Sequence, residues 1–256
     1  MAYKDFILDT ARLWFMSAAG DRSTLSAHVY QQVRAAILSG RLQPGQRLKV
    51  SDLSAKHGVS LNVVREALNR LTGEQLVRAV PQVGFAVTDL SLEDLADLVK
   101  VRLLVESTAL RWAIEHGDMT WESQVVAAHY RLANTAMTAD ETGLLTYDWI
   151  RAHSEFHAMI LSGSSSRRMQ DITRSLSDQA DLYRRWSLPL TPRDLPAEHA
   201  EIMDATLSRD ADRAVAALTA HIEQTRNTII ENAAADIAQP RRSREMPPSR
   251  QRQMLA

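Results

Sequence analysis

Residues 33–71 have the sequence VRAAILSGRLQPGQRLKVSDLSAKHGVSLNVVREALNRL, which decides the fold class of the N-terminal part of the chain. Apolar residues recur at helical spacing up to Ile37, so a helix is predicted there. Gly40 ends that helix, and Pro44–Gly45 supplies a turn directly after it. The segment therefore begins with one helix followed by a tight change of direction.

Two further short helices are predicted in the same segment. Ser51 offers an N-cap for the first of them, and Gly58 ends it. Ser60 then caps a second helix, which continues to Leu71. Two short helices joined by a glycine turn are typical of a helix-turn-helix.

A β-hairpin is predicted after these helices. Residues 76–80 and 85–87 have the composition of short strands, and the four residues between them, Pro81–Gly84, supply a turn with a glycine at its tip. A hairpin in this place forms the wing of a winged helix-turn-helix. The compact unit that we predict spans residues 23–89.

Composition limits the class of protein. The 256 residues are 45% hydrophobic and 24% charged, which is typical of a soluble globular protein large enough for two domains. No apolar run approaches the roughly 20 residues that span a bilayer, so no membrane partner is expected. The absence of cysteine rules out disulfides and thiolate metal ligands, and a cytoplasmic location fits best.

The charge is unevenly distributed. Residues 21–90 hold nine Lys/Arg and five acidic residues, a formal charge of +4, whereas the rest of the chain carries −5. A basic unit joined to an acidic remainder is what a polyanion-binding domain on a regulatory body would have.

The remainder of the chain divides into three further regions: an N-terminal extension at 1–22, a helical domain at 91–238, and a polar, basic, proline-containing tail at 239–256 that we expect to be disordered. The helical domain opens with a cap at Ser91, and no strand pattern occurs in it. Further helices are predicted at 121–138, 141–162, 167–187, 194–208 and 210–235. The predicted fold is therefore mainly α, with a bundle of six or seven helices.

Both parts resemble known families. The N-terminal unit is similar to the GntR family of regulators in three segments: Val33–Leu48, Gly58–Ser60 and Val64–Leu71. The helical domain resembles the FCD ligand-binding domain of the FadR subfamily in five segments: Val101–Glu106, Glu155–His157, Glu198–Ile202, Asp210–Ala214 and His221–Ile222. The resemblance implies a dimer that binds pseudo-palindromic operator DNA and releases or engages it when a small ligand binds.

The resemblance implies DNA contacts in the N-terminal unit. Arginine reads guanine with two hydrogen bonds and asparagine can read adenine, so Asn62 and Arg65 are expected in the major groove. Leu61 departs from the family, which often has an arginine there, so a different operator sequence is expected. The alternatives are a solvated helix charge for each arginine and a simple turn glycine in the wing. The predicted DNA-binding residues are Arg34, Ser60, Asn62, Arg65 and Gly84.

Four histidines form a candidate metal site. His153 and His157 are four residues apart on a predicted helix, so their imidazoles share one face and can bind one ion. The resemblance adds His199 and His221, and it places an acidic or amide ligand where this chain has His153. We expect a divalent metal, zinc first and nickel or another as alternatives. The alternative is that these histidines are ordinary polar or core residues.

The resemblance also implies an effector site near the metal. Arg102 matches a family arginine that points into the cavity, where it would bind a small carboxylate. The alternative is a salt bridge to Glu106. Two other functions were weighed: a metal-dependent hydrolase, disfavoured because Ser154 follows His153 where a metalloprotease motif has Glu, and a ligand-independent DNA-binding protein, which leaves the helical domain unexplained. We expect a repressor that is not an enzyme.

Overall fold

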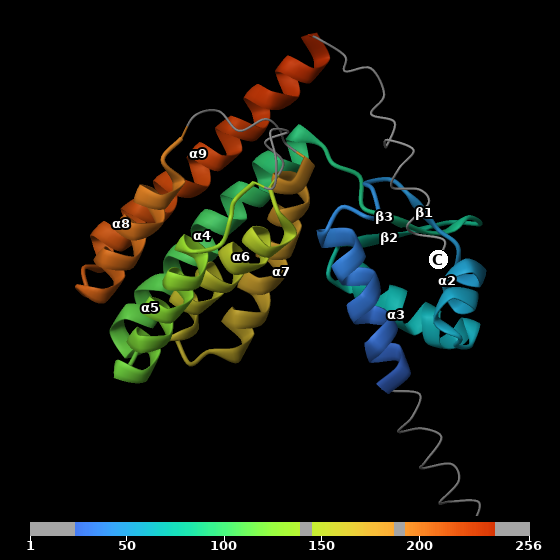
Figure 1. Ribbon diagram of the computed structural model, residues 1–256, viewed down its shortest axis with the longest axis horizontal. Coiled ribbons are helices and arrows are strands. Elements are labelled where there is room, and N and C mark those ends of the chain that lie inside the picture. The colour runs from blue at the N-terminus through green and yellow to red at the C-terminus, as the bar shows by residue number, and fades with distance from the viewer. Residues whose placement is uncertain (1–23, 139–144, 187–192, 239–256) are drawn as a thin grey trace, which may run out of the picture.

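The computed structural model describes residues 24–138, 145–186 and 193–238. The fold is mainly helical, as predicted, and consists of an N-terminal unit and a helical bundle (Figure 1). Helix α7 lies on the side of the bundle that faces the N-terminal unit. The predicted extension 1–22 and tail 239–256 lie outside the described residues.

The N-terminal unit contains the predicted helices. A helix covers residues 24–38, α2 covers Val50–His57 and α3 covers Leu61–Gly73. Gly58 ends α2 with a φ of 64°, a left-handed conformation that glycine adopts without strain. The helix-turn-helix is therefore present in the predicted segment.

The prediction that Ser51 caps α2 is wrong. Lys49 is the N-cap residue, and no side chain among the described residues caps the helix. A helix that includes Val50 places Val50 and Leu53 on one face, where both pack against the apolar core of the N-terminal unit. The earlier start is therefore accompanied by packing of this pair and not by a serine cap.

A three-stranded antiparallel sheet completes the unit. Strand β3 (Gly84–Val87) lies between β1 (Arg47–Leu48) and β2 (Val77–Val80). Strands β2 and β3 are the predicted hairpin, with Val80 opposite Gly84. Strand β1 was not predicted, because two residues carry no detectable strand pattern.

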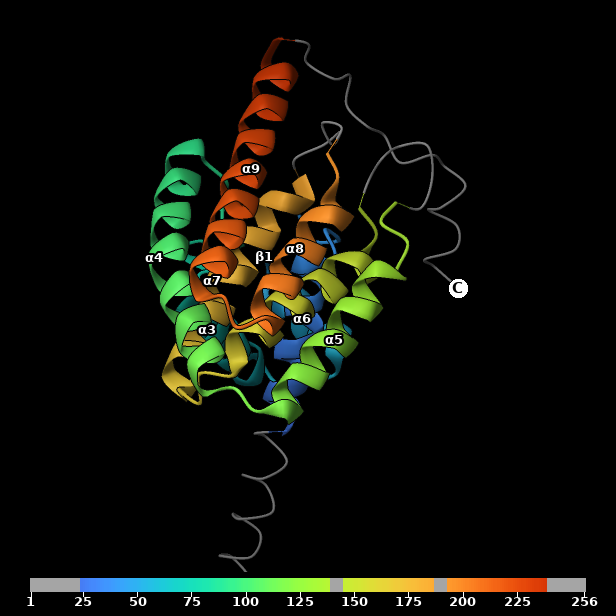
Figure 2. The same cartoon turned by 90° about the vertical axis from the view of Figure 1, so that its left-hand side faces the viewer.

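The bundle contains six helices within the described residues. They are α4 (Leu92–His116), α5 (Met119–Ala133), α6 (Tyr147–Ser162), α7 (Arg167–Trp186), α8 (Leu195–Leu207) and α9 (Ala211–Ala238). Figure 2 shows α9 and α8 in front, with α4 on one flank and α5 on the other. One continuous apolar cluster joins all six helices.

Helix α6 begins later than the predicted residue 141. Thr146 is its N-cap, because the Thr146 side chain accepts a hydrogen bond from the Trp149 backbone N–H at 3.0 Å. A single β-bridge between Thr138 and Leu145 closes the connection from α5. The residues between these two, 139–144, lie outside the described part of the chain.

Candidate functional site

The exposed end of α3 carries the predicted DNA-reading side chains. The Ser60 hydroxyl accepts a hydrogen bond from the Val63 backbone N–H at 3.4 Å and caps the helix. Asn62 and Arg65 are exposed near the N-terminal end of α3, and neither makes a side-chain hydrogen bond or ion pair with any residue that the structure describes. Both are therefore accessible to a partner from outside.

The wing stands beside this helix-turn-helix as a short, supported hairpin. Gly84 has a φ of 109°, which an L side chain rarely adopts, and a β-carbon at this position would meet no atom within 4 Å. The Arg47 guanidinium donates a hydrogen bond to the Val83 carbonyl at 3.0 Å and holds the tip against β1. Glycine is therefore needed for the turn itself.

Arg34 does not lie with the other predicted DNA contacts. Its guanidinium forms an ion pair with Asp178 of α7, in the contact between the N-terminal unit and the bundle. It lines a cleft together with Arg70 and Glu74, at the C-terminal end of α3, whereas Ser60 caps the opposite end. The Arg34 guanidinium, which was predicted to contact DNA, is thus paired with a carboxylate from a distant part of the chain.

The four predicted metal ligands meet in the core of the bundle. His153 and His157 come from α6, His199 from α8 and His221 from α9, and all four are buried. Their ring centroids lie between 4.4 and 5.7 Å apart. One nitrogen from each ring can be chosen so that all four lie within 4.8 Å of one another. We call these residues the histidine cluster.

Most nitrogens of the histidine cluster have no hydrogen-bond partner. Five buried atoms are unpaired among the described residues: His153 Nδ1, His157 Nδ1, His157 Nε2, His199 Nε2 and His221 Nε2. An unpaired buried polar atom costs about 1–3 kcal/mol, so the cluster is expensive as it stands. Its geometry leaves room for a species that accepts several nitrogen lone pairs.

The Glu198 carboxylate orients the His221 ring by bonding to the nitrogen that does not face the cluster. His221 donates from Nδ1 to Glu198 Oε2 at 2.9 Å, which leaves Nε2 as the lone-pair nitrogen facing the cluster. Arg193 in turn forms an ion pair with Glu198 and donates to the His221 backbone carbonyl at 3.0 Å. A carboxylate behind a histidine is the usual arrangement around metal-binding imidazoles.

The cluster is held neutral. Burial, followed by the charges of neighbouring histidines and arginines, lowers the pKa of His153, His157 and His221 well below that of free imidazole. Burial and then Arg184 lower the pKa of His199 to about 3. Neutral imidazoles are the form that binds metal.

Two buried ion pairs lie around the cluster. Arg102 donates to Glu106 from Nε at 2.6 Å and from Nη2 at 3.2 Å. Arg184 pairs with Asp181, and Asp181 also accepts a hydrogen bond from Ser154 at 2.5 Å. For Arg102 the structure therefore has the salt bridge that was the alternative to effector binding.

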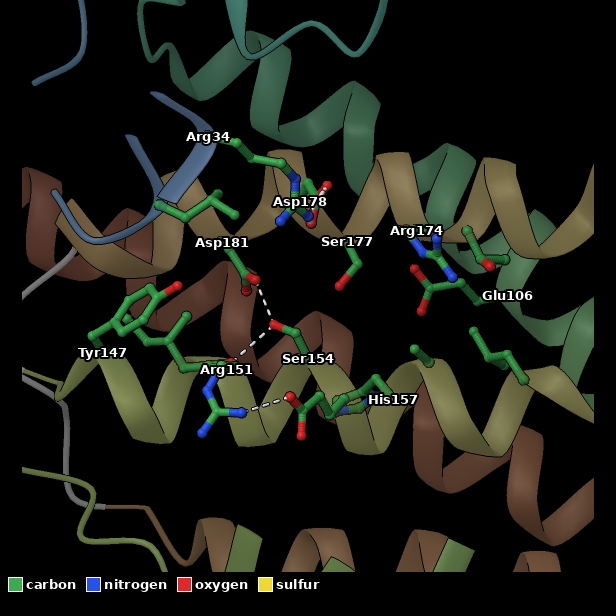
Figure 3. Close-up of a pocket in the computed structure, with 16 residues that line it drawn as sticks. Arg34, Glu106, Tyr147, Arg151, Ser154, His157, Arg174, Ser177, Asp178 and Asp181 are labelled. Carbon is green, nitrogen blue, oxygen red and sulfur yellow. Dashed lines mark hydrogen bonds and ion pairs between the residues drawn. The ribbon is translucent and has the colours of Figure 1, made fainter. Parts of the chain in front are cut away.

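A cavity of about 370 Å³ opens between α6, α7 and the helix at 24–38 (Figure 3). We call it the junction cavity, because Arg34 and Leu38 of the N-terminal unit form part of its wall. His157 lines it, as does Arg174, which makes no ion pair with a described residue. A second cavity, of about 200 Å³, is lined by His199.

Three carboxylates around these residues were not predicted as partners. Glu198 was noted only as part of a family segment, and Asp178 and Asp181 had no assignment. A charged residue in an amphipathic helix carries no sign of whether it faces solvent or a neighbouring helix. These contacts become visible only when the helices are packed, and that of Asp178 only when α7 lies against the N-terminal unit.

A winged helix-turn-helix with an unpaired recognition helix, joined to a helical bundle with a buried polar cluster, defines a class: two-part transcriptional regulators. Comparison with known families agrees. Residues 25–87 match the family described as bacterial regulatory proteins, gntR family, and residues 97–224 match the FCD domain. The chain belongs to the GntR family, carries an FCD domain, and is a transcriptional regulator and not an enzyme.

Individual relatives are similar over most of their length. The chain is 37% identical to the HTH-type transcriptional regulator BphR of Paraburkholderia xenovorans (strain LB400), over 81% of this chain and 85% of that protein. It is 29% identical to the HTH-type transcriptional repressor GlaR of Escherichia coli (strain K12), over 80% and 96%. A solved GntR regulator from Rhodococcus sp. RHA1 superimposes with a TM-score of 0.65 at 26% identity, over 80% and 97%.

One negative finding completes the description. Within the described residues, none of the helices is both long enough and apolar enough to cross a membrane.

Proposed function

We propose that the protein is a ligand-responsive repressor whose FCD domain, residues 91–238, holds a divalent metal and controls operator binding by residues 23–89. The observation that carries this proposal is the set of unpaired nitrogens in the histidine cluster. An unpaired polar group inside a core is costly, and a metal ion would satisfy several of them at once.

The donor set favours zinc. Zinc binds neutral imidazole with tetrahedral geometry at about 2.0–2.1 Å, which separates its nitrogen ligands by about 3.4 Å. The candidate nitrogens here lie within 4.8 Å of one another, so small side-chain rotations close the site. Nickel and other divalent ions that accept imidazole are the alternatives. When bound, the metal would supply positive charge for an anionic effector.

The junction cavity is the proposed effector site. Its volume of about 370 Å³ is within the range of small-molecule pockets, and it brings Arg174 and the buried His157 to one space. Arg174 has no carboxylate of its own among the described residues, so it can bind the carboxylate of a small metabolite. Arg102, which pairs with Glu106, would take part only if the effector displaced that carboxylate.

The operator contacts that we propose are Asn62 and Arg65 in the major groove, Ser60 on a phosphate and Gly84 at the wing. We propose a homodimer through α4, because Val101, Leu104 and Trp112 form an exposed apolar stripe along that helix. Leu104 alone is 73% exposed. A two-fold dimer would match a pseudo-palindromic operator.

Metal analysis of the purified protein tests the proposal. We expect about one zinc or nickel ion per chain in the wild type and almost none after His199→Ala with His221→Ala. The matched control is His116→Ala, because His116 is exposed at the end of α4 and outside the cluster. Equal metal content in the wild type and the double variant would refute the metal site.

A further inference from the structure

We propose that the ion pair between Arg34 and Asp178 fixes the orientation of the N-terminal unit on the bundle, and thereby sets the half-site spacing that the dimer accepts. This inference rests on the proposed operator binding by a dimer. It assigns Arg34 a positioning role in place of the DNA contact that the sequence suggested.

The two charges come from opposite sides of the contact between the parts. Arg34 lies on the helix at 24–38 and Asp178 on α7, 144 residues later in the chain. Their side chains are 24% and 9% exposed, so the pair is largely shielded from water. Figure 3 shows the Arg34 side chain reaching across to Asp178 beside the junction cavity.

The same part of α7 makes one other contact with the N-terminal unit and one with the start of α4. Leu182, one turn after Asp178, packs into the apolar core of that unit. Tyr183 donates to Asp94 at 2.5 Å and accepts from the Ser91 backbone N–H at 3.3 Å, where the chain passes from one part to the other. Leu182 therefore joins α7 to the N-terminal unit, whereas Tyr183 fixes α7 to the start of α4.

Among the described contacts between the two parts, the ion pair restricts the angle most. An apolar contact such as that of Leu182 is non-directional, so the unit could rotate on it with little loss. Arg34 brings one terminal nitrogen to both carboxylate oxygens of Asp178, a charge-assisted contact that is lost when rotation moves the two side chains apart. The Tyr183 contacts lie within the bundle, at the start of α4, and do not fix the angle of the N-terminal unit.

Helix α7 is also anchored in the bundle, on its other side. Asp181 accepts a hydrogen bond from Ser154, which lies on α6 between His153 and His157. The helix that orients the N-terminal unit is therefore bonded to the helix that supplies half of the histidine cluster.

The spacing between operator half-sites that a dimer accepts depends on this orientation. Each inserted base pair separates two half-sites by about 3.4 Å more and rotates them by about 34°. A dimer whose DNA-binding units are held at one angle accepts one spacing. A dimer whose units rotate freely accepts several, without any change in the residues that read the bases.

The experiment starts from a duplex selected out of a random library by the wild-type protein. Binding is then measured to that duplex and to versions with one or two base pairs inserted or deleted between the half-sites. We expect the wild type to lose about tenfold in affinity per altered base pair, and Asp178→Asn and Arg34→Gln to lose less than about threefold. Asp178→Asn should have no further effect in the Arg34→Gln background.

The matched control is Asp171→Asn. Asp171 lies on the same helix and lines the same cleft, and it makes no ion pair with a described residue, so this variant should discriminate spacings like the wild type. A general loss of stability would lower affinity for every spacing alike and would not move the ratio.

The outcomes separate the two proposals. If the wild type selects no duplex, the proposed operator binding fails. If it selects one but tolerates altered spacings, or if both variants discriminate as sharply as the wild type, operator binding stands and the orienting role of the ion pair is overturned.

Discussion

The protein has unpaired polar groups in two regions with opposite surroundings. At the start of α3, Asn62 and Arg65 are exposed, and water satisfies them until a partner arrives. In the histidine cluster the unpaired nitrogens are buried and no water competes for them. Leaving the exposed groups without a protein partner therefore costs little free energy, whereas leaving the buried nitrogens unpaired costs more. The difference is what the two proposals require: a reversibly bound polyanion at the first region and a resident ion at the second.

The largest expected effect is at the buried histidine cluster. Removal of metal with a chelator should lower the apparent stability of the bundle by about 4 kcal/mol, if free metal had been near a thousand times its dissociation constant. Thermal unfolding followed by circular dichroism, with and without added zinc chloride, measures this. An unchanged melting temperature after verified removal of metal would mean that the cluster stabilises itself.

At the exposed start of α3 we expect the reverse, namely a loss of DNA affinity with little change in stability. Arg65→Ala is expected to weaken binding to the selected duplex by about 1–3 kcal/mol and to change the unfolding free energy by less than about 0.5 kcal/mol. Fluorescence anisotropy and urea unfolding separate the two quantities. Arg131→Ala, an exposed arginine on α5, is the control and should bind as the wild type does. Retained affinity in Arg65→Ala would remove this residue from the interface.

The pH dependence of the metal-free protein tests whether the cluster is held neutral. Because folding lowers the pKa of the four histidines, the unfolded state binds more protons below pH 6.5, and stability is present above that value and lost as pH falls. At pH 5.5 each fully depressed histidine costs about 1.4 kcal/mol.

One group acts in the opposite direction in the same range. Burial raises the pKa of Asp178 to about 6, so this carboxyl favours the folded state slightly as pH falls from 6 toward 4. Urea midpoints between pH 5 and 8 should therefore fall with acid in the wild type and fall less in His199→Phe. Identical pH profiles for the two proteins would contradict the prediction.

The smallest expected effect separates capping from DNA contact at Ser60. Ser60→Ala should cost about 1 kcal/mol of stability through loss of the N-cap, whereas Ser60→Asp restores the cap. The aspartate, however, puts a negative charge against the phosphates, so its DNA affinity should stay low. If Ser60→Asp binds the selected duplex as tightly as the wild type, Ser60 acts only as a cap.

Much of both regions could be predicted from local sequence. The glycine turn at Gly58, the Ser60 cap and the hairpin are decided by residues close together in the chain, and the structure has all three. The helical spacing of His153 and His157 placed both on one face of α6. The pairing with His199 and His221 came from family resemblance, since no local pattern joins three separate helices.

Contacts with distant parts of the chain account for one wrong prediction and one unexpected pairing. Ser51 was expected to cap α2, but the helix starts at an earlier residue, and Val50 and Leu53 pack against the apolar core. Arg34 was predicted to contact DNA, and in this structure its guanidinium pairs with Asp178. Neither contact could be predicted from local sequence, and the local preference for a serine cap is worth only about 1 kcal/mol.

The sequence by itself determined the helices, the turn glycines, the wing and the shared face of His153 and His157, because these depend on periodicity and on backbone preferences that act over a few residues. Only the tertiary structure decided that the four imidazoles lie buried together without partners, that Arg102 pairs with Glu106, and that α7 joins the two parts through Arg34. Partner choice among charged and polar side chains depends on distance and exclusion of water, and both are set when the helices pack.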